Sequence, residues 1–175
     1  MGQLSGTCEK PFEAAAQPGR RIGIYVRSGD VTISGTSGFA VRVRCMLDDA
    51  STPNGVRISF AAGNLRIYSG PNRKIRLQID VPERSDLLVR SLAGNVSLAG
   101  VTGDKDVSLR AGDLTIQVGS PEVYRVAEGS VLAGSLNAPA FGVVKDGLFR
   151  SFRKSSEKGQ YRLRADLTAG DLTLK

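Results

Sequence analysis

The sequence predicts an all-β protein built from short, stacked strands, and three observations support this. Apolar and polar residues alternate over most of the chain, which is the period of a strand with one buried face. Glycine makes up 21 of the 175 residues, against an average near 7%, so many tight turns are expected. A string of Gly, Asp or Asn, aliphatic, Ser or Thr, aliphatic recurs along the chain. We therefore expect a β-solenoid, with a β-sandwich or a β-roll as the alternatives.

Each copy of the string predicts a sharp corner followed by a short strand. Glycine tolerates positive φ, an Asp or Asn closes an Asx-type turn onto its own backbone, and the aliphatic residues that follow point inward. Looser copies begin at Gly63, Asp106, Gly129 and Gly134, and the 18-residue step from Gly94 to Gly112 is typical of stacked units. The predicted structural corners are Gly29, Asp30, Gly94, Asn95, Gly112, Asp113, Gly170 and Asp171.

Two segments differ from this pattern, and together with the repeats they suggest how the chain is organised. Residues 1–20 are expected to form an N-terminal tail or cap, and residues 21–175 a single solenoid domain with a polar loop at 48–55 and a turn at 69–72. The most regular units cover residues 87–118, where six side chains should stack inside: Val96, Leu98, Val107, Leu109, Leu114 and Ile116.

A basic insertion is expected at residues 145–160. The slightly longer segment 145–164 holds seven cations and two carboxylates, with Phe149, Phe152 and Tyr161 among them. One interpretation is a surface insertion whose aromatic rings dock on the solenoid; the other is an anion-binding site for an acidic glycan or nucleic acid. The candidate anion-binding residues are Lys145, Arg150, Arg153, Lys154, Lys158, Arg162 and Arg164.

Arginine accounts for 17 of the 24 basic residues and gives the chain a net charge of +7. Many arginines alternate with apolar residues, as in Val41-Arg42-Val43-Arg44, and should therefore lie on outward strand faces. Such faces are either simply solvated or attract anions such as polysaccharide, nucleic acid or lipid headgroups. The alternation does not choose between these two interpretations.

The chain contains two cysteines, Cys8 and Cys45, too few for a four-ligand metal site. They could form a disulfide in an exported protein, and the alternative is two free or buried thiols. The sequence contains neither a membrane-spanning apolar run nor a signal sequence. Because small and polar residues follow Met1, we expect that a targeting segment is missing and that the protein is exported, periplasmic or at the cell surface; a cytoplasmic location is the alternative.

The composition limits the chemistry that this chain can perform. There is no histidine, which excludes Ser-His-Asp and Cys-His catalytic systems and histidine metal ligands. A β-helical polysaccharide lyase or hydrolase would have to use the acidic group Asp104, Asp106 and Asp113 near Arg110, although turn formation explains two of these carboxylates. Calcium ladders need a repeat half as long as this one. We therefore expect no enzymatic activity, no metal and no cofactor.

The repeats resemble those of the bacterial putative-adhesin family, a large group of domains of unknown function. The matching pieces are Ser28 to Gly35, Ala93 to Leu98, Ala111 to Ile116 and Ala169 to Leu174, within a resemblance that spans about residue 20 to the end. It implies a right-handed single-stranded parallel β-helix, usually exported or membrane-anchored, with no established enzymatic activity. The arginine-rich surface departs from that family's commoner acidic or neutral one.

These observations favour a non-catalytic cell-envelope scaffold or adhesion module that contacts a protein or polysaccharide surface. The alternative function is a binder of anionic polymer through residues 145–164. A homodimer through the solenoid ends is a further expectation, because the last unit would leave Leu172 and Leu174 at an exposed edge.

Overall fold

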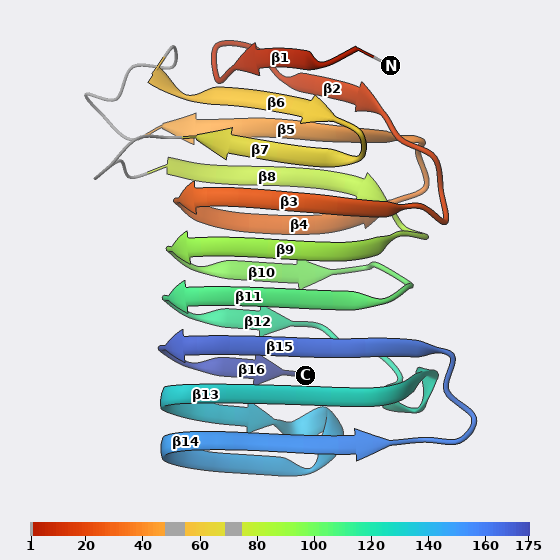
Figure 1. Cartoon of the computed structure of the whole chain (residues 1–175), viewed down its shortest axis with the longest axis vertical. Helices are drawn as coiled ribbons and strands as arrows, with labels where there is room; N and C mark the ends of the chain where they lie inside the picture. The colour runs from red at the N-terminus through yellow and green to blue at the C-terminus, as the bar shows by residue number, and fades with distance from the viewer. Residues whose placement is uncertain (1, 48–54, 69–74) are drawn as a thin grey trace.

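The computed structural model describes residues 2–47, 55–68 and 75–175. The expected turn at 69–72, and the expected loop at 48–55 except its last residue, lie outside these ranges. The described residues form one mixed sheet in which β14 (Val143–Ser155) pairs with β13 (Tyr124–Ala138) at one end (Figure 1). The prediction of an all-β fold is confirmed.

The sheet is folded on itself at β13, whose first part pairs with one layer and whose last part pairs with the other. The first layer contains, in spatial order, β1 (Leu4–Thr7), β6 (Arg57–Ala61), β7 (Asn64–Tyr68), β3 (Arg21–Ser28), β9 (Asp86–Ala93), β11 (Lys105–Ala111) and β15 (Tyr161–Ala169). The second contains β16 (Leu172–Leu174), β12 (Leu114–Ile116), β10 (Val96–Ala99), β4 (Asp30–Thr36), β8 (Ile75–Pro82), β5 (Ala40–Leu47) and β2 (Phe12–Ala15).

The centre of the molecule consists of parallel units, each with one strand in each layer. β3 leads into β4, β9 into β10, β11 into β12 and β15 into β16, and equivalent strands pair in parallel. In-register pairing stacks inward side chains of the same kind, for example Val96 on Leu114 and Leu98 on Ile116. All six side chains expected inside the central units are buried, so this part of the predicted core is confirmed.

The units do not stack in chain order, and this is where the structure departs from the predicted solenoid. After β12 the chain crosses to β13, reverses into the antiparallel β14, and returns so that β15 and β16 lie between the β11–β12 unit and β13 (Figure 1). Antiparallel strands also flank the units at the other end of the sheet. The sheet is therefore mixed, and parallel units stacked in chain order are confined to its centre.

This order corrects the expectation that the last unit is an exposed edge. β16 pairs with β12 on one side and with β13 on the other, and Leu172 and Leu174 are fully buried. The strand at that end of the sheet is β14. The ends expected to mediate a homodimer are thus formed by β14 and by the β1 and β2 region, and association there stays a prediction.

The segment expected to be a basic insertion is part of the sheet. Residues 143–155 form β14, which pairs with β13 from Ala138 back to Val126. Because β13 bends at Gly134, β14 bends beside it at Gly147, which lies opposite Gly134 in the register. Phe152 is buried against Phe141, with ring centroids 5.5 Å apart, whereas Phe149 is 78% exposed.

The N-terminal residues expected to form a tail or cap supply two short strands at the edges of the sheet. β1 pairs with β6 and β2 pairs with β5, both antiparallel. Cys8, which follows β1, forms a disulfide with Cys45 in β5, with Cα atoms 5.4 Å apart. This bond joins strands of the two layers.

Candidate functional site

Glycine corners connect the two strands of each central unit, β3 to β4, β9 to β10, β11 to β12 and β15 to β16. Gly29, Gly94, Gly112 and Gly170 all have positive φ, and a Cβ on Gly112 would lie 2.1 Å from the carbonyl oxygen of Gly94. Only glycine fits such close stacking. A fifth corner is Gly134, whereas Gly129, also expected to be a corner, lies within β13 against Phe152.

The Asp and Asn residues of these corners bond between units, whereas the sequence predicted bonds within each turn. The Oδ1 atom of Asp30 accepts the Asn95 amide (2.9 Å), that of Asn95 accepts the Asp113 amide (3.0 Å) and that of Asp113 accepts the Asp171 amide (3.1 Å). Asp171 accepts from both the amide and the hydroxyl of Ser135, and the hydroxyl bond, then the amide bond, lowers the pKa of Asp171. The ladder fixes the register between units.

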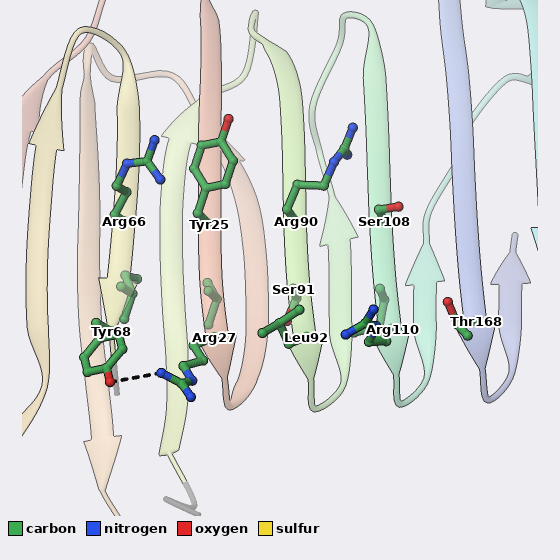
Figure 2. Close-up of a pocket in the computed structure, with 13 residues that line it drawn as sticks. Tyr25, Arg27, Arg66, Tyr68, Arg90, Ser91, Leu92, Ser108, Arg110 and Thr168 are labelled. Atoms are coloured by element: carbon green, nitrogen blue, oxygen red, sulfur yellow. Dashed lines mark hydrogen bonds between the residues drawn. The ribbon is translucent and has the colours of Figure 1, made fainter. Parts of the chain in front are cut away.

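The outer face of the first layer carries a shallow groove that crosses β7, β3, β9, β11 and β15 (Figure 2). Its volume is about 730 Å³. These five strands are mutually parallel, so residues at matching positions form rows across the strands. The polar and exposed lining residues are Tyr25, Arg27, Arg66, Tyr68, Arg90, Leu92, Ser108, Arg110 and Thr168.

The lining falls into two rows. In the first row, Arg66 pairs in register with Tyr25, Tyr25 with Arg90, and Arg90 with Ser108. The second row lies two residues further along each strand, on the same outer face. It consists of Tyr68, Arg27, Leu92, Arg110 and Thr168.

Two of the arginines are held by tyrosine rings on neighbouring strands. The guanidinium carbon of Arg66 lies 4.5 Å from the centroid of Tyr25, and that of Arg27 lies 5.2 Å from the centroid of Tyr68. Arg27 also donates from Nη1 to the Tyr68 hydroxyl at 2.9 Å (Figure 2). Stacking of this kind reduces the conformational freedom of the arginines before any ligand arrives.

The other two arginines differ in how far they are neutralised. Arg90 forms an ion pair with Asp106 at 3.1 Å and donates to two backbone carbonyls. Arg110 forms no ion pair with any residue in the described parts of the chain. Among the residues that the structure describes, no carboxylate lines the groove, so its electrostatic potential favours anions. Guanidinium groups suit carboxylate, sulfate and phosphate because two N–H groups can donate in parallel.

The outer face of the second layer has a different chemistry. In-register pairing aligns small hydroxyl side chains from Thr32 through Ser97 and Thr115 to Thr173, ending at Asn137. This row is uncharged. The two faces of the central units are therefore chemically distinct, and the arginines of the groove lie on only one of them.

The seven predicted anion-binding residues do not form one site. Lys145 lies opposite Leu136, beyond the bend of β13, while Arg153 lies opposite Glu128 in the first layer. Arg153 pairs with Glu128 at 3.3 Å, and Arg164 pairs with Asp166 at 2.8 Å, which raises the pKa of Arg164. Lys145 and Arg150 donate to backbone carbonyls within β14. Arg162 is an exposed residue of β15, and Lys154 and Lys158 are exposed near the end of β14.

The three carboxylates considered for catalysis have separate partners. Asp104 accepts the amide of Arg162 at 2.8 Å, Asp106 pairs with Arg90, and Asp113 belongs to the corner ladder. The backbone amide of Asp104 in turn donates to the Oδ1 atom of Asp86 at 2.8 Å. A second ladder thus links β9, β11 and β15 at the opposite end of these strands.

A buried lysine was not anticipated from the sequence. Lys105 is only 2% exposed, and its Nζ donates to the Tyr124 hydroxyl at 2.6 Å and to the Gly103 carbonyl at 3.3 Å. Burial lowers the pKa of Lys105 to about 8, with Asp104 and Asp86 opposing the shift, and burial raises the pKa of Tyr124 to about 12. Polar and apolar residues alternate from Asp106 to Leu109, and extending this alternation back by one residue places Lys105 on the inward face. This pattern was the signal in the sequence for a buried lysine.

The groove itself was also missed. Arginines alternate with apolar residues in several strands, but the sequence alone does not show that Tyr25 lies between Arg66 and Arg90, which are 24 residues apart. That adjacency follows from the order of β7, β3 and β9 in the sheet. Two Arg/Tyr pairs at i, i+2, on β3 and on β7, were the local signal.

Comparison with solved structures shows a shared fold. A "putative cell adhesion protein" from Clostridium sporogenes superposes with a TM-score of 0.53 at 11% identity, covering 95% of this chain and 98% of that one. A "putative adhesin" from Bacteroides fragilis aligns at 8% identity over 95% of this chain and 98% of that one. Its TM-score of 0.24 is too low to indicate a shared fold. No protein-family model and no curated protein matches the sequence. Within the described residues, no helix is long and apolar enough to span a membrane.

Proposed function

We propose that this chain is a non-catalytic adhesion module of the bacterial cell envelope and that the groove on its first layer binds an anionic polymer. The observation that carries the proposal is the set of four arginines that cross parallel strands in a groove whose described lining contains no carboxylate. The similarity in fold to a protein described as a cell adhesion protein is consistent with an interaction role. The disulfide suits an exported protein, since such bonds persist in oxidising compartments.

The groove, rather than the basic segment, is the preferred binding surface because of how the charges are arranged. Two cations of the basic segment are neutralised by Glu128 and Asp166, and the segment is divided by the bend of the sheet. Of the four groove arginines, Arg90 alone is paired with a carboxylate of the described residues. An extended polymer can contact all four arginines at once, because they lie on adjacent strands of one face.

The test is retention on heparin agarose and on immobilised polymannuronate at low salt. We expect the double variant Arg66→Ala/Arg110→Ala to elute at clearly lower salt than the native chain, because polymer binding releases counterions in proportion to the charges involved. The matched control is Arg150→Ala/Lys154→Ala on β14, which removes the same charge and should elute close to the native chain.

Two results would contradict this assignment. If the β14 variant loses retention while the groove variant keeps it, the basic segment is the binding site. If the native chain is retained on neither matrix, it is not a binder of anionic polymer. Release of reducing ends during incubation with polymannuronate would show that the module is catalytic.

We also infer that the parallel units wind in a right-handed sense. The path from β9 through β10 to β11 connects two parallel strands of one layer, and about 98% of such connections are right-handed. A crystal structure with a left-handed path from β9 to β11 would contradict this.

A further inference from the structure

The four arginines of the groove alternate between its two rows from strand to strand. Arg66 on β7 lies in the first row and Arg27 on β3 in the second; Arg90 on β9 returns to the first and Arg110 on β11 to the second. The strand order β7, β3, β9, β11 makes these neighbours in space. The positions between them hold uncharged side chains: Tyr68, Tyr25, Leu92 and Ser108.

This zigzag has defined dimensions. Neighbouring strands lie about 4.8 Å apart, so the groove offers one guanidinium for each strand spacing, alternately on its two sides. A ligand that uses all four must therefore advance by about one strand spacing per anionic group and turn successive groups to opposite sides. Side-chain lengths allow some adjustment, but the sequence of sides is fixed by the register of the strands.

A β-1,4-linked chain of uronic acids has this arrangement. Its pyranose rings are linked through equatorial bonds into a flat ribbon that advances by close to one strand spacing per sugar. Successive sugars are turned over by about half a turn, so their carboxylates project alternately to the two sides. An α-linked polyuronate with axial bonds carries the same charge per sugar on a buckled chain and does not match the zigzag.

The lining also argues against nucleic acid as the ligand. Single-stranded binders usually offer free aromatic faces on which bases stack. Here Tyr25 and Tyr68 each already stack with a guanidinium, at 4.5 and 5.2 Å respectively. The remaining lining groups, including Ser108 and Thr168, are hydroxyls suited to sugar hydroxyl groups.

We propose that the groove is specific for an extended β-1,4-linked polyuronate that lies across the strands, with one carboxylate at each of Arg66, Arg27, Arg90 and Arg110 in turn. This specificity rests on the proposed binding of anionic polymer by the same groove. The carboxylate at Arg90 would share that guanidinium with Asp106. Affinity should rise with oligomer length until each arginine has one sugar and then level off.

The experiment is isothermal titration of the native chain with polymannuronate and polyguluronate oligomers of equal length and charge, with single-stranded DNA as a third probe. We expect the β-linked polymannuronate to bind at least about tenfold tighter than the α-linked polyguluronate, since misplaced carboxylates lose charge-assisted hydrogen bonds. Equal affinities for the two, or tighter binding of DNA, would overturn the proposed specificity while leaving anionic-polymer binding intact. Absence of binding to all three probes would instead refute the proposed function.

A charge-neutral rearrangement tests the geometry directly. The double variant Tyr25→Arg/Arg27→Tyr keeps composition and net charge but moves the arginine of β3 into the row of Arg66 and Arg90. We expect it to bind both polyuronates with similar affinity, and a preserved preference for polymannuronate would contradict the zigzag. Arg150→Ala/Lys154→Ala on β14, which lies outside the groove and leaves the zigzag in place, is the control and should retain the preference; thermal unfolding checks that each variant is folded.

Discussion

At the residue scale, a few side chains determine how closely the units stack. Gly94, Gly112 and Gly170 each lie against the backbone of the neighbouring corner glycine. The Asp or Asn of each corner accepts an amide from the next unit. The glycine and its neighbour therefore act between units rather than within one turn. The string in the sequence identifies the correct residues, but their hydrogen-bond partners are visible only after the units are stacked.

The variant Gly112→Val tests this close packing. Its Cβ would lie 2.1 Å from the Gly94 oxygen, and φ is +134° at this position, so we expect a loss of at least about 3 kcal/mol in the free energy of unfolding. The conservative change Thr115→Ser, in the same unit but on the outer face, should cost less than about 0.5 kcal/mol. Urea unfolding measures both, and equal midpoints would refute the corner's role.

Lys105 makes stability depend on pH in the alkaline range. The pKa of Lys105 is about 8 in the folded chain, whereas the ordinary pKa of a lysine is 10.5, so between these values the unfolded chain binds more protons and stability rises with pH. The full effect is on the order of 3 kcal/mol, and it opposes the loss expected above pH 10 from Tyr124, whose pKa is raised to about 12. Below both lysine values the contribution of Lys105 is constant.

The measurement is urea unfolding at several pH values from 7 to 10 for the native chain and Lys105→Met. We expect the free energy of unfolding of the native chain to increase relative to that of Lys105→Met as the pH rises. Lys158→Met, at an exposed position, should run parallel to the native chain. A pH-independent difference between the native chain and Lys105→Met would mean that Lys105 has an ordinary pKa.

At the scale of elements, the disulfide is expected to fasten the N-terminal strands. Cys8 and Cys45 are 37 residues apart, and closing a loop of that length removes about 4 kcal/mol of conformational freedom from the unfolded chain. Cys8→Ala/Cys45→Ala, or the native chain in reductant, should therefore unfold at lower urea. Identical midpoints with and without reductant would show that the bond does not stabilise the fold.

β14 is the element through which the chain could self-associate. It pairs only with β13 among the described strands, and Val144, Leu148 and Phe149 are 70%, 64% and 78% exposed. Lysines on an edge strand oppose pairing with a second copy, because like charges would face each other. We expect Lys145→Thr/Lys154→Thr to dimerise at concentrations where the native chain is monomeric in sedimentation velocity. Unchanged sedimentation would show that these lysines do not protect the edge.

At the scale of the whole molecule, periodicity predicts the strands but not their spatial order. The buried faces of the central units follow from alternation alone, as Val96 and Leu114 illustrate. The insertion of β15 and β16 between the β11–β12 unit and β13 does not, because parallel units with similar inward residues can stack in several orders. The order follows from the parallel pairing of β15 with both β11 and β13, and of β16 with both β12 and β13.

The same difference in scale explains why the sequence points to the basic segment and not to the groove. A cluster of cations within one segment is visible in the sequence, whereas Arg66, Arg27, Arg90 and Arg110 come from four strands and become neighbours only through the topology. The basic segment, in turn, is divided by the bend at Gly134 and partly neutralised. Sheet order, rather than composition, therefore defines the candidate binding face.

The most direct test of this account is a map of backbone amide chemical shifts during titration of the native chain with polymannuronate oligomers. We predict that the shifts concentrate on β7, β3, β9 and β11 around Tyr25, Arg66, Arg90 and Arg110. The hydroxyl row of the second layer and the basic strand β14 should remain unchanged. Shifts centred on β14, with none in the groove, would contradict the central claim.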